Sequence, residues 1–249
     1  MFGRIFTVGG YTLLSRLTGF ARDIMLAAIL GATGPVADAF FVALRLPNHF
    51  RAIFAEGAFN AAFVPAYAHV HGEKGEGSAK LFADRIFTLL FASQLVLLVV
   101  AWLFMPQAMS ILAPGFTEDA AQRQLAIDLT RITFPYLLLI TLVTLYGGML
   151  NVMQRFASAA AASIFLNIAM MATLAVAVWF PTPGHAAAWG VLISGFLQYF
   201  LLAGDLARHG GLPVCEKLSA DVISLPMHPY LDEPTQARVI EAVHGALQA

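Results

Sequence analysis

Four stretches of the chain are apolar without interruption by a charged residue, and each is about as long as a membrane-spanning helix. A helix needs roughly 20 apolar residues to cross the hydrocarbon of a bilayer. Proline and glycine residues separate most of these stretches, which marks the turns between them. Arg155 alone stands between the second and the third, so a tight helical hairpin is predicted there. The four predicted spans are residues 86–105, 132–154, 156–180 and 186–204.

Two earlier segments, residues 4–31 and 37–68, are apolar overall but carry charged side chains. The turn GATGPVA at 31–37 divides them, because glycine and proline together favour a reversal of the chain. Both segments are predicted to be amphipathic membrane helices. The fold class expected is therefore all-α, a polytopic membrane helical bundle with about six transmembrane helices.

Composition supports this class. Of the 249 residues 59% are hydrophobic and 12% are charged, whereas a soluble domain carries about 25% charged residues. The net charge of −1 excludes a basic surface for nucleic acid, and the one cysteine, Cys215, excludes an internal disulfide. Lysine and arginine are more frequent in the loops on one side of the predicted spans, which places the amino terminus in the cytoplasm.

The composition changes abruptly after residue 211. Residues 212–249 contain a short apolar run, a proline-rich loop and a predicted amphipathic helix, a pattern typical of soluble protein. Two parts are therefore expected, a six-helix transmembrane lobe over 1–211 and a cytoplasmic tail over 212–249.

Residues 15–67 carry charges where a membrane protein rarely tolerates them. On insertion scales a charged side chain at the centre of a bilayer costs roughly 2.5–3.5 kcal/mol. Such residues persist when they face a wet cavity, pair with one another or meet a charged ligand. The function is therefore expected to lie in this stretch.

Beyond Arg4 at its start, the first predicted helix holds three charged residues. Arg16 and Asp23 are seven residues apart and share one face, while Arg22 points about 120° away from Arg16 in a regular helix. One interpretation is a cationic wall facing the interior with a partner carboxylate. The other is a structural ion pair that locks the first helix to the second.

The second helix repeats the pattern, since Asp38 and Arg45 are again seven residues apart on one face. Pro47 is predicted to bend or break the helix, with Arg51 and Glu56 following the break. Discontinuous helices of this kind are found at transporter binding sites. The alternative is a plain proline kink with Arg51 reaching the membrane interface. Arginine holds planar or phosphate anions through paired N–H donors, which favours an anionic ligand.

Known catalytic and metal-binding motifs are absent from the sequence. It contains no P-loop, GxSxG or HExxH motif, and its histidines lack the spacing of metal ligands. The chain is therefore not expected to be an enzyme, and no cofactor or metal is predicted.

Three segments, SRLTGFARD, DAFFVALRLPNHFRAIFAEGAFNAAFVPAY and GGMLNVMQRFA, resemble the MurJ/MviN family over about residues 1–210. The resemblance implies a flippase of lipid II, the lipid-linked precursor of peptidoglycan, in the bacterial inner membrane. It also implies the fold of the multidrug and oligosaccharidyl-lipid exporter superfamily. Such proteins have two six-helix lobes and two further helices around a cationic cavity that alternates its access. This chain supplies one lobe.

The resemblance also assigns residues. Arg16 and Arg22 match through SRxxGFARD, Asp38 through DAFF and Arg51 through LPNxxR, and all four are expected to bind the pyrophosphate-linked substrate. Gating or packing roles are expected for Glu56, Pro47, Asp23 and Arg45.

The tail resembles the carboxyl end of the DegT/DnrJ/EryC1 sugar aminotransferases. It lacks their cofactor-binding lysine region, so aminotransferase activity is not expected, and a truncated flippase gene joined to an unrelated end would produce this sequence. Two alternative functions remain open. One is a cation-coupled drug or oligosaccharide exporter of the same superfamily, and the other is a truncated fusion product that transports nothing.

Overall fold

A computed structural model of the chain describes residues 2–31, 33–54, 58–113, 115 and 119–208. These residues form helices joined by short turns, without a strand among them, which confirms the predicted all-α class. The predicted tail, 212–249, lies outside the described residues. The elements are α1 (Phe2–Leu30), α2 (Pro35–Phe54), α3 (Ala58–Leu103), α4 (Met105–Leu112), α5 (Ala120–Thr133), α6 (Tyr136–Val152), α7 (Phe156–Ala175), the 3₁₀ turn η2 (Ala177–Trp179) and α8 (Pro183–Arg208).

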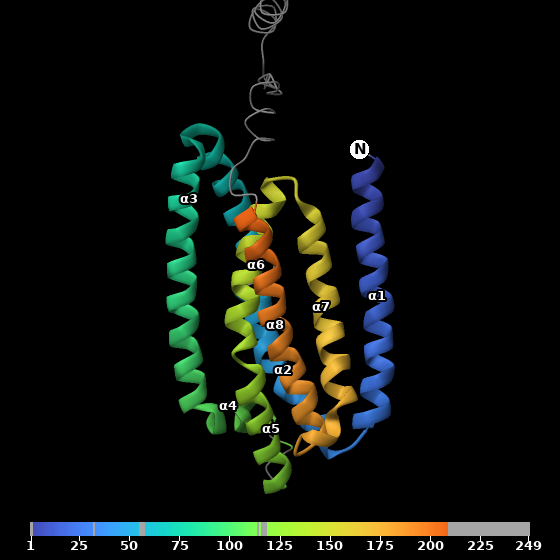
Figure 1. Ribbon diagram of the computed structural model, residues 1–249. Coiled ribbons are helices and arrows are strands. Elements are labelled where there is room, and N and C mark those ends of the chain that lie inside the picture. Colours follow the sequence, from blue (N-terminus) through green and yellow to red (C-terminus); the bar gives the residue numbers. More distant parts are fainter. Residues whose placement is uncertain (1, 32, 55–57, 114, 116–118, 209–249) are drawn as a thin grey trace, which may run out of the picture. The chain divides into compact units, whose positions relative to one another are not determined.

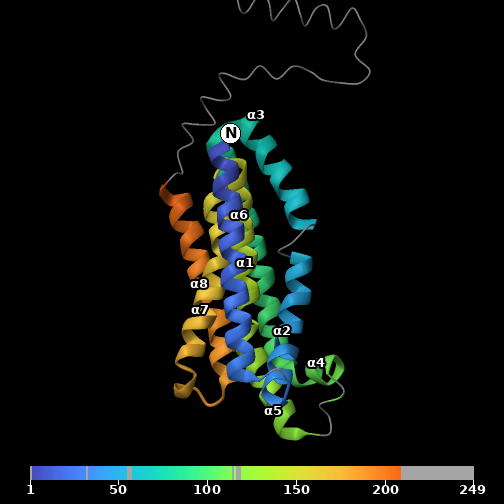
Figure 2. The ribbon, with the colours of Figure 1, turned by 90° about the vertical axis from the view of Figure 1, so that its right-hand side faces the viewer.

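The long helices lie side by side, up and down the bundle (Figures 1 and 2). The start of α1, the bend of α3 and the α6–α7 turn lie at one end, and α4, α5 and η2 lie at the other. Helix α1 packs chiefly against α7, α2 against α5, and α7 against α8. Helices α1 and α2 thus pack against helices that are distant in the sequence, whereas α7 packs against the next helix along the chain.

Four helical stretches are long and apolar enough to cross a membrane. Within the described part of the chain they are Phe59–Leu103, Ala120–Val152, Phe156–Ala175 and Pro183–Arg208. Helices α1 and α2 do not meet this criterion, and both contain the charged residues of the expected functional stretch. The protein is therefore a helical membrane protein, and the count of six spans stays a prediction.

Glycines allow the turn between α1 and α2. Gly31 has φ +89° and Gly34 has φ +142°, values that residues with a side chain rarely adopt. The amide of Gly31 still donates to the carbonyl of Ala27, which ends α1 in the manner of a glycine C-cap. Helix α2 then begins at Pro35, so the turn is shorter than the predicted 31–37.

Of the predicted bend or break at Pro47, the break is wrong. Helix α2 runs through Pro47 to Phe54. A proline has no N–H to donate to the carbonyl four residues earlier, which here belongs to Ala43. The hydroxyl oxygen of Thr133, at the end of α5, lies 3.2 Å from that carbonyl oxygen and can donate to it instead. Membrane helices tolerate proline where a neighbouring hydroxyl satisfies the freed group.

Helix α3 includes residues 69–85, which the predicted spans 37–68 and 86–105 leave between them as a loop. It continues helically from Ala58 to Leu103, with one bend at Gly75, where φ is +74° and ψ is 177°. The bend divides α3 into two arms and needs glycine, because φ is positive. Phe63 and Phe82, from the two arms, stack with their ring centroids 6.0 Å apart.

The predicted span 132–154 begins in the middle of a longer helical pair. Asp119 caps α5 by accepting hydrogen bonds from the amides of Ala121 and Gln122, at 2.9 and 3.1 Å. A turn at Phe134–Pro135 then separates α5 from α6. Because α5 carries polar residues along its length, its sequence has no uninterrupted apolar run that would predict a membrane helix.

The hairpin predicted at Arg155 is confirmed, since α6 ends at Val152 and α7 begins at Phe156. Arg155 forms an ion pair with Asp205 of α8 at 3.7 Å. Helices α7 and α8 approach closely at Gly190, where an added Cβ would lie 2.8 Å from the backbone Cα of Met170. The predicted spans 156–180 and 186–204 correspond to α7 with η2 and to α8.

Candidate functional site

A cavity of about 300 Å³ lies among α1, α2, α6, α7 and α8. Two arginines and one carboxylate reach it, namely Arg22 and Asp23 from α1 and Arg51 from α2. Pro47, Asn48 and Tyr136 add further lining. Its apolar lining consists of Leu26, Phe40, Phe41, Leu44, Leu166, Met170 and Val191.

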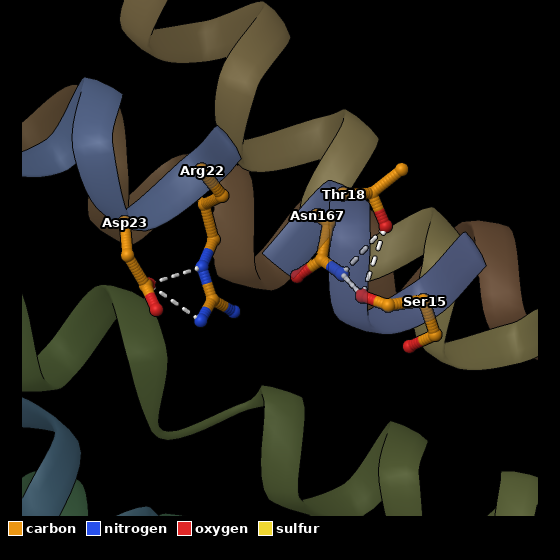
Figure 3. A network of polar contacts seen from close by, with 5 residues as sticks. All are labelled: Ser15, Thr18, Arg22, Asp23 and Asn167. Carbon is orange, nitrogen blue, oxygen red and sulfur yellow. Dashed lines mark hydrogen bonds and ion pairs between the residues drawn. The ribbon is translucent and has the colours of Figure 1, made fainter. Parts of the chain in front are cut away.

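Arg22 and Asp23 form an ion pair at the cavity (Figure 3). The Nε and Nη2 groups of Arg22 both donate to Oδ1 of Asp23, at 2.9 and 2.7 Å. The side chain of Arg22 is 23% exposed and that of Asp23 is 62% exposed. Asp23 therefore pairs with its sequence neighbour on α1. The ion pair lies within α1. It is therefore neither a pairing of Asp23 with Arg16 nor an ion pair that joins the first helix to the second.

Arg51 lies half-buried on α2, four residues beyond Pro47. It shares the lining of the cavity with Tyr136 of α6 and Val191 of α8. Tyr136 and Gln198 are buried, at 8% and 3% exposed. The Arg51 side of the cavity is therefore held by α6 and α8 as well as by α2.

Three other predicted residues do not line this cavity. Arg16 and Arg45 are exposed on α1 and α2. Asp38 is exposed in the first turn of α2, where the positive end of the helix dipole favours a carboxylate. Glu56 lies outside the described residues. The structure thus brings together Arg22, Asp23, Pro47 and Arg51, and the substrate contacts expected of Arg16 and Asp38 stay predictions.

The chemistry of the cavity favours an anion. Two guanidinium groups and one carboxylate leave a net positive charge, and the rest of the lining is mostly apolar. Opposite charges attract more strongly in such a setting than in water. Within the described ranges no group of three metal-ligating side chains occurs. The net positive charge of the cavity lining therefore favours an anionic ligand.

Asn167 of α7 fastens α1 beside this site (Figure 3). Its amide nitrogen donates to the carbonyl of Ser15 at 3.1 Å and to the hydroxyl of Thr18 at 3.0 Å. Thr18 in turn donates to the carbonyl of Leu14 at 2.9 Å. Asn167 is only 4% exposed, so its amide has exchanged water for these partners. We call Ser15, Thr18 and Asn167 the α1–α7 clasp.

Replacing Asn167 with leucine is expected to loosen α1 from α7. Two hydrogen bonds would be lost from a buried membrane position, where each contributes about 0.5–1.5 kcal/mol. The free energy of unfolding should fall by about 1–3 kcal/mol on this basis, measured by SDS-induced unfolding in mixed micelles. Ser163→Ala is the control, because Ser163 is exposed on the same helix and bonds only within it. An equal loss in both variants would contradict the clasp.

No role was predicted for the neutral polar residues of the charge-free spans. Tyr136, Asn167 and Gln198 are buried around the site, and Thr133 supports α2. A signal was present, because a buried polar group in a membrane needs a partner and therefore marks a helix contact. The partner of each buried polar residue depends on how distant segments pack. The sequence therefore predicts that such a residue makes a helix contact but not which residue it contacts.

Comparison with known proteins identifies relatives over most of the chain. The family model described as lipid II flippase MurJ matches residues 26–225. The probable lipid II flippase MurJ of Rhizobium tropici is 43% identical over 216 residues, covering 85% of this chain and 40% of the relative. The lipid II flippase MurJ of Burkholderia cenocepacia is 38% identical over 215 residues, covering 86% and 42%. The match to the family model runs past residue 211, and the aminotransferase-like character of the tail stays a prediction.

A solved structure shares the fold. Lipid II flippase MurJ in an inward closed conformation matches with a TM-score of 0.64 at 23% identity, covering 86% of this chain and 44% of that one. The chain spans about two fifths of the length of the curated relatives that it matches. The sequence motifs, the family model and the helical architecture agree, and the chain belongs to the MurJ family of lipid II flippases.

Proposed function

We propose that this lobe provides one wall of the substrate cavity of a lipid II flippase. The observation that carries the proposal is the convergence of Arg22 and Arg51, from different helices, on one cavity of a membrane helix bundle. Lipid II carries a pyrophosphate group, and paired guanidinium donors match phosphate oxygens in geometry and charge. The apolar lining would accompany the lipid-linked part of the ligand.

Asp23 serves as the counter-ion of the empty site in this proposal. Its carboxylate occupies two N–H donors of Arg22 and lowers the cost of holding a guanidinium in the membrane. An incoming diphosphate replaces the carboxylate with a more highly charged acceptor. Asp23 is more exposed than Arg22, so it can turn away without leaving a buried charge unpaired.

Transport requires a second wall. The relatives are more than twice as long as the matched segment, and we propose that the remaining length supplies the opposing lobe. The lobes would move against each other in the bacterial inner membrane and expose the cavity to the two sides in turn. The amino terminus of this lobe is proposed to face the cytoplasm.

A direct binding test separates this function from its alternatives. The purified chain is placed in phosphatidylcholine nanodiscs and titrated with fluorescent lipid II. We expect saturable binding that undecaprenyl pyrophosphate displaces and that tetraphenylphosphonium, a hydrophobic cation, does not. Binding of the cation without lipid II would support a cation-coupled exporter. Folded chain that binds neither ligand would support the reading that this polypeptide transports nothing.

A further inference from the structure

We infer that Thr133 is a positioning residue for Arg51. The inference rests on the proposed function, because it assumes that the place of the Arg51 guanidinium matters for diphosphate binding. Thr133 is fully buried at the end of α5, and its hydroxyl oxygen lies 3.2 Å from the carbonyl oxygen of Ala43. That carbonyl has lost its usual helical donor, because residue 47 is proline.

The hydrogen bond from Thr133 to Ala43 lies at the turn of α2 where Pro47 removes an internal hydrogen bond. Ala43 precedes Pro47 by four residues and Arg51 follows it by four, so each is about one helical turn away. The path of α2 through this turn decides where Arg51 enters the cavity. A carbonyl without a donor favours a wider bend at proline, since bending lets the group find another partner. A hydrogen bond from the Thr133 hydroxyl satisfies the Ala43 carbonyl, so the helix does not need to bend further.

Two neighbours of Thr133 act on the same region. The ring of Phe134 meets the ring of Phe50, next to Arg51, edge to face with centroids 6.1 Å apart. Tyr136 lines the same cavity as Arg51. The end of α5 and the turn after it therefore contact α2 on both sides of Pro47. We call Thr133, Phe134 and Tyr136 the α5–α6 brace.

The hydroxyl of Thr133 has one alternative acceptor. Its oxygen is 3.3 Å from the carbonyl of Thr130, within its own helix. Valine at position 133 would keep the shape of threonine but would leave the Ala43 carbonyl buried without this donor. Serine would keep the donor. These two variants separate the hydrogen bond from the packing.

The decisive experiment is a double-mutant cycle with Pro47. Pro47→Ala restores an amide that can donate to the Ala43 carbonyl, which makes the Thr133 hydroxyl redundant. In the parent chain, Thr133→Val should weaken lipid II binding about tenfold, while Thr133→Ser should stay within about twofold. In the Pro47→Ala background, Thr133→Val should change the affinity by less than about twofold. Equal losses in both backgrounds, or no loss in either, overturn the inference.

A second readout needs no ligand. Asn48 lines the cavity beside Pro47, so a cysteine there, in a Cys215→Ser background, reports the local geometry through its rate of labelling by a charged maleimide. Thr133→Val should alter this rate with proline at position 47 and leave it unchanged with alanine. If the parent chain binds no lipid II, the proposed function fails, and the labelling cycle alone decides whether Thr133 sets the path of α2. Unchanged labelling in every variant overturns the inference.

Discussion

Replacing Arg22 or Arg51 with glutamine is expected to weaken lipid II binding by about 10- to 100-fold for each substitution. A hydrogen bond to a charged group contributes about 1.5–3 kcal/mol, which is about 10- to 100-fold in affinity. Each guanidinium can supply a pair of such bonds to a diphosphate, and a glutamine amide can keep one of the pair. The double variant should bind no lipid II in the same titration. Glutamine keeps much of the side-chain length, so the measurement isolates the positive charge and the fork of donors.

A matched control comes from Arg85, which is exposed on α3 and does not line the cavity. Arg85→Gln removes the same charge from the lobe, and binding should remain within about twofold of the parent, because an exposed charge is screened by solvent. Equal weakening by all three single substitutions would show that total charge, and not the cavity, governs binding. Unchanged affinity after loss of both cavity arginines would falsify the assignment of the site.

Replacing Gly190 with alanine is expected to destabilise the lobe by about 2 kcal/mol, within the range of overpacked cores. The new methyl group would meet the backbone of Met170 at 2.8 Å and would collide with the hydroxyl of Thr173. A side chain can rotate away, but backbone cannot, so α7 and α8 must separate. Met170 and Val191 both line the cavity, and separation should therefore also lower ligand affinity.

Gly204→Ala in the same helix is the control, because an added Cβ there meets nothing within 4 Å. Alanine is the better helix former by about 1 kcal/mol, so this variant should be as stable as the parent or slightly more so. Both variants would be compared by SDS-induced unfolding in mixed micelles and by recovery of monodisperse protein. Similar behaviour of the two variants would mean that α7 and α8 are not held at their closest approach by Gly190.

The charge-free spans could be predicted because the membrane imposes one simple rule on them. Long apolar runs must be helical in lipid, and the runs at 156–180 and 186–204 correspond to α7 with η2 and to α8. Helix α5 was missed because it is amphipathic and carries polar residues along one face. The loop expected between 68 and 86 was wrong for a related reason, since a polar stretch can remain helical where it is exposed to solvent.

The residues of the candidate site were predictable in part. The sequence singled out Arg22, Asp23, Pro47 and Arg51, which line one cavity, but also Arg16, which does not line it. Helical spacing gives the direction of a Cβ and not the course of a long side chain, so Arg22 could turn to Asp23 without any sign of this in the spacing. The carbonyl of Ala43, which loses its helical donor at Pro47, lies against the hydroxyl of Thr133. Thr133 is 86 positions beyond Pro47, so the local sequence could not predict this contact.

The two cavity arginines belong to helices with different anchors. Arg22 is on α1, which the clasp of Asn167 ties to α7, whereas Arg51 is on α2, which packs chiefly against α5. In the proposed function, a diphosphate held by both guanidinium groups would join two helices that scarcely pack against each other in the described part of the chain. Ligand release and separation of α1 from α2 are then reciprocally linked, since each favours the other by the same free energy. A bound diphosphate would then act as a removable cross-link between α1 and α2.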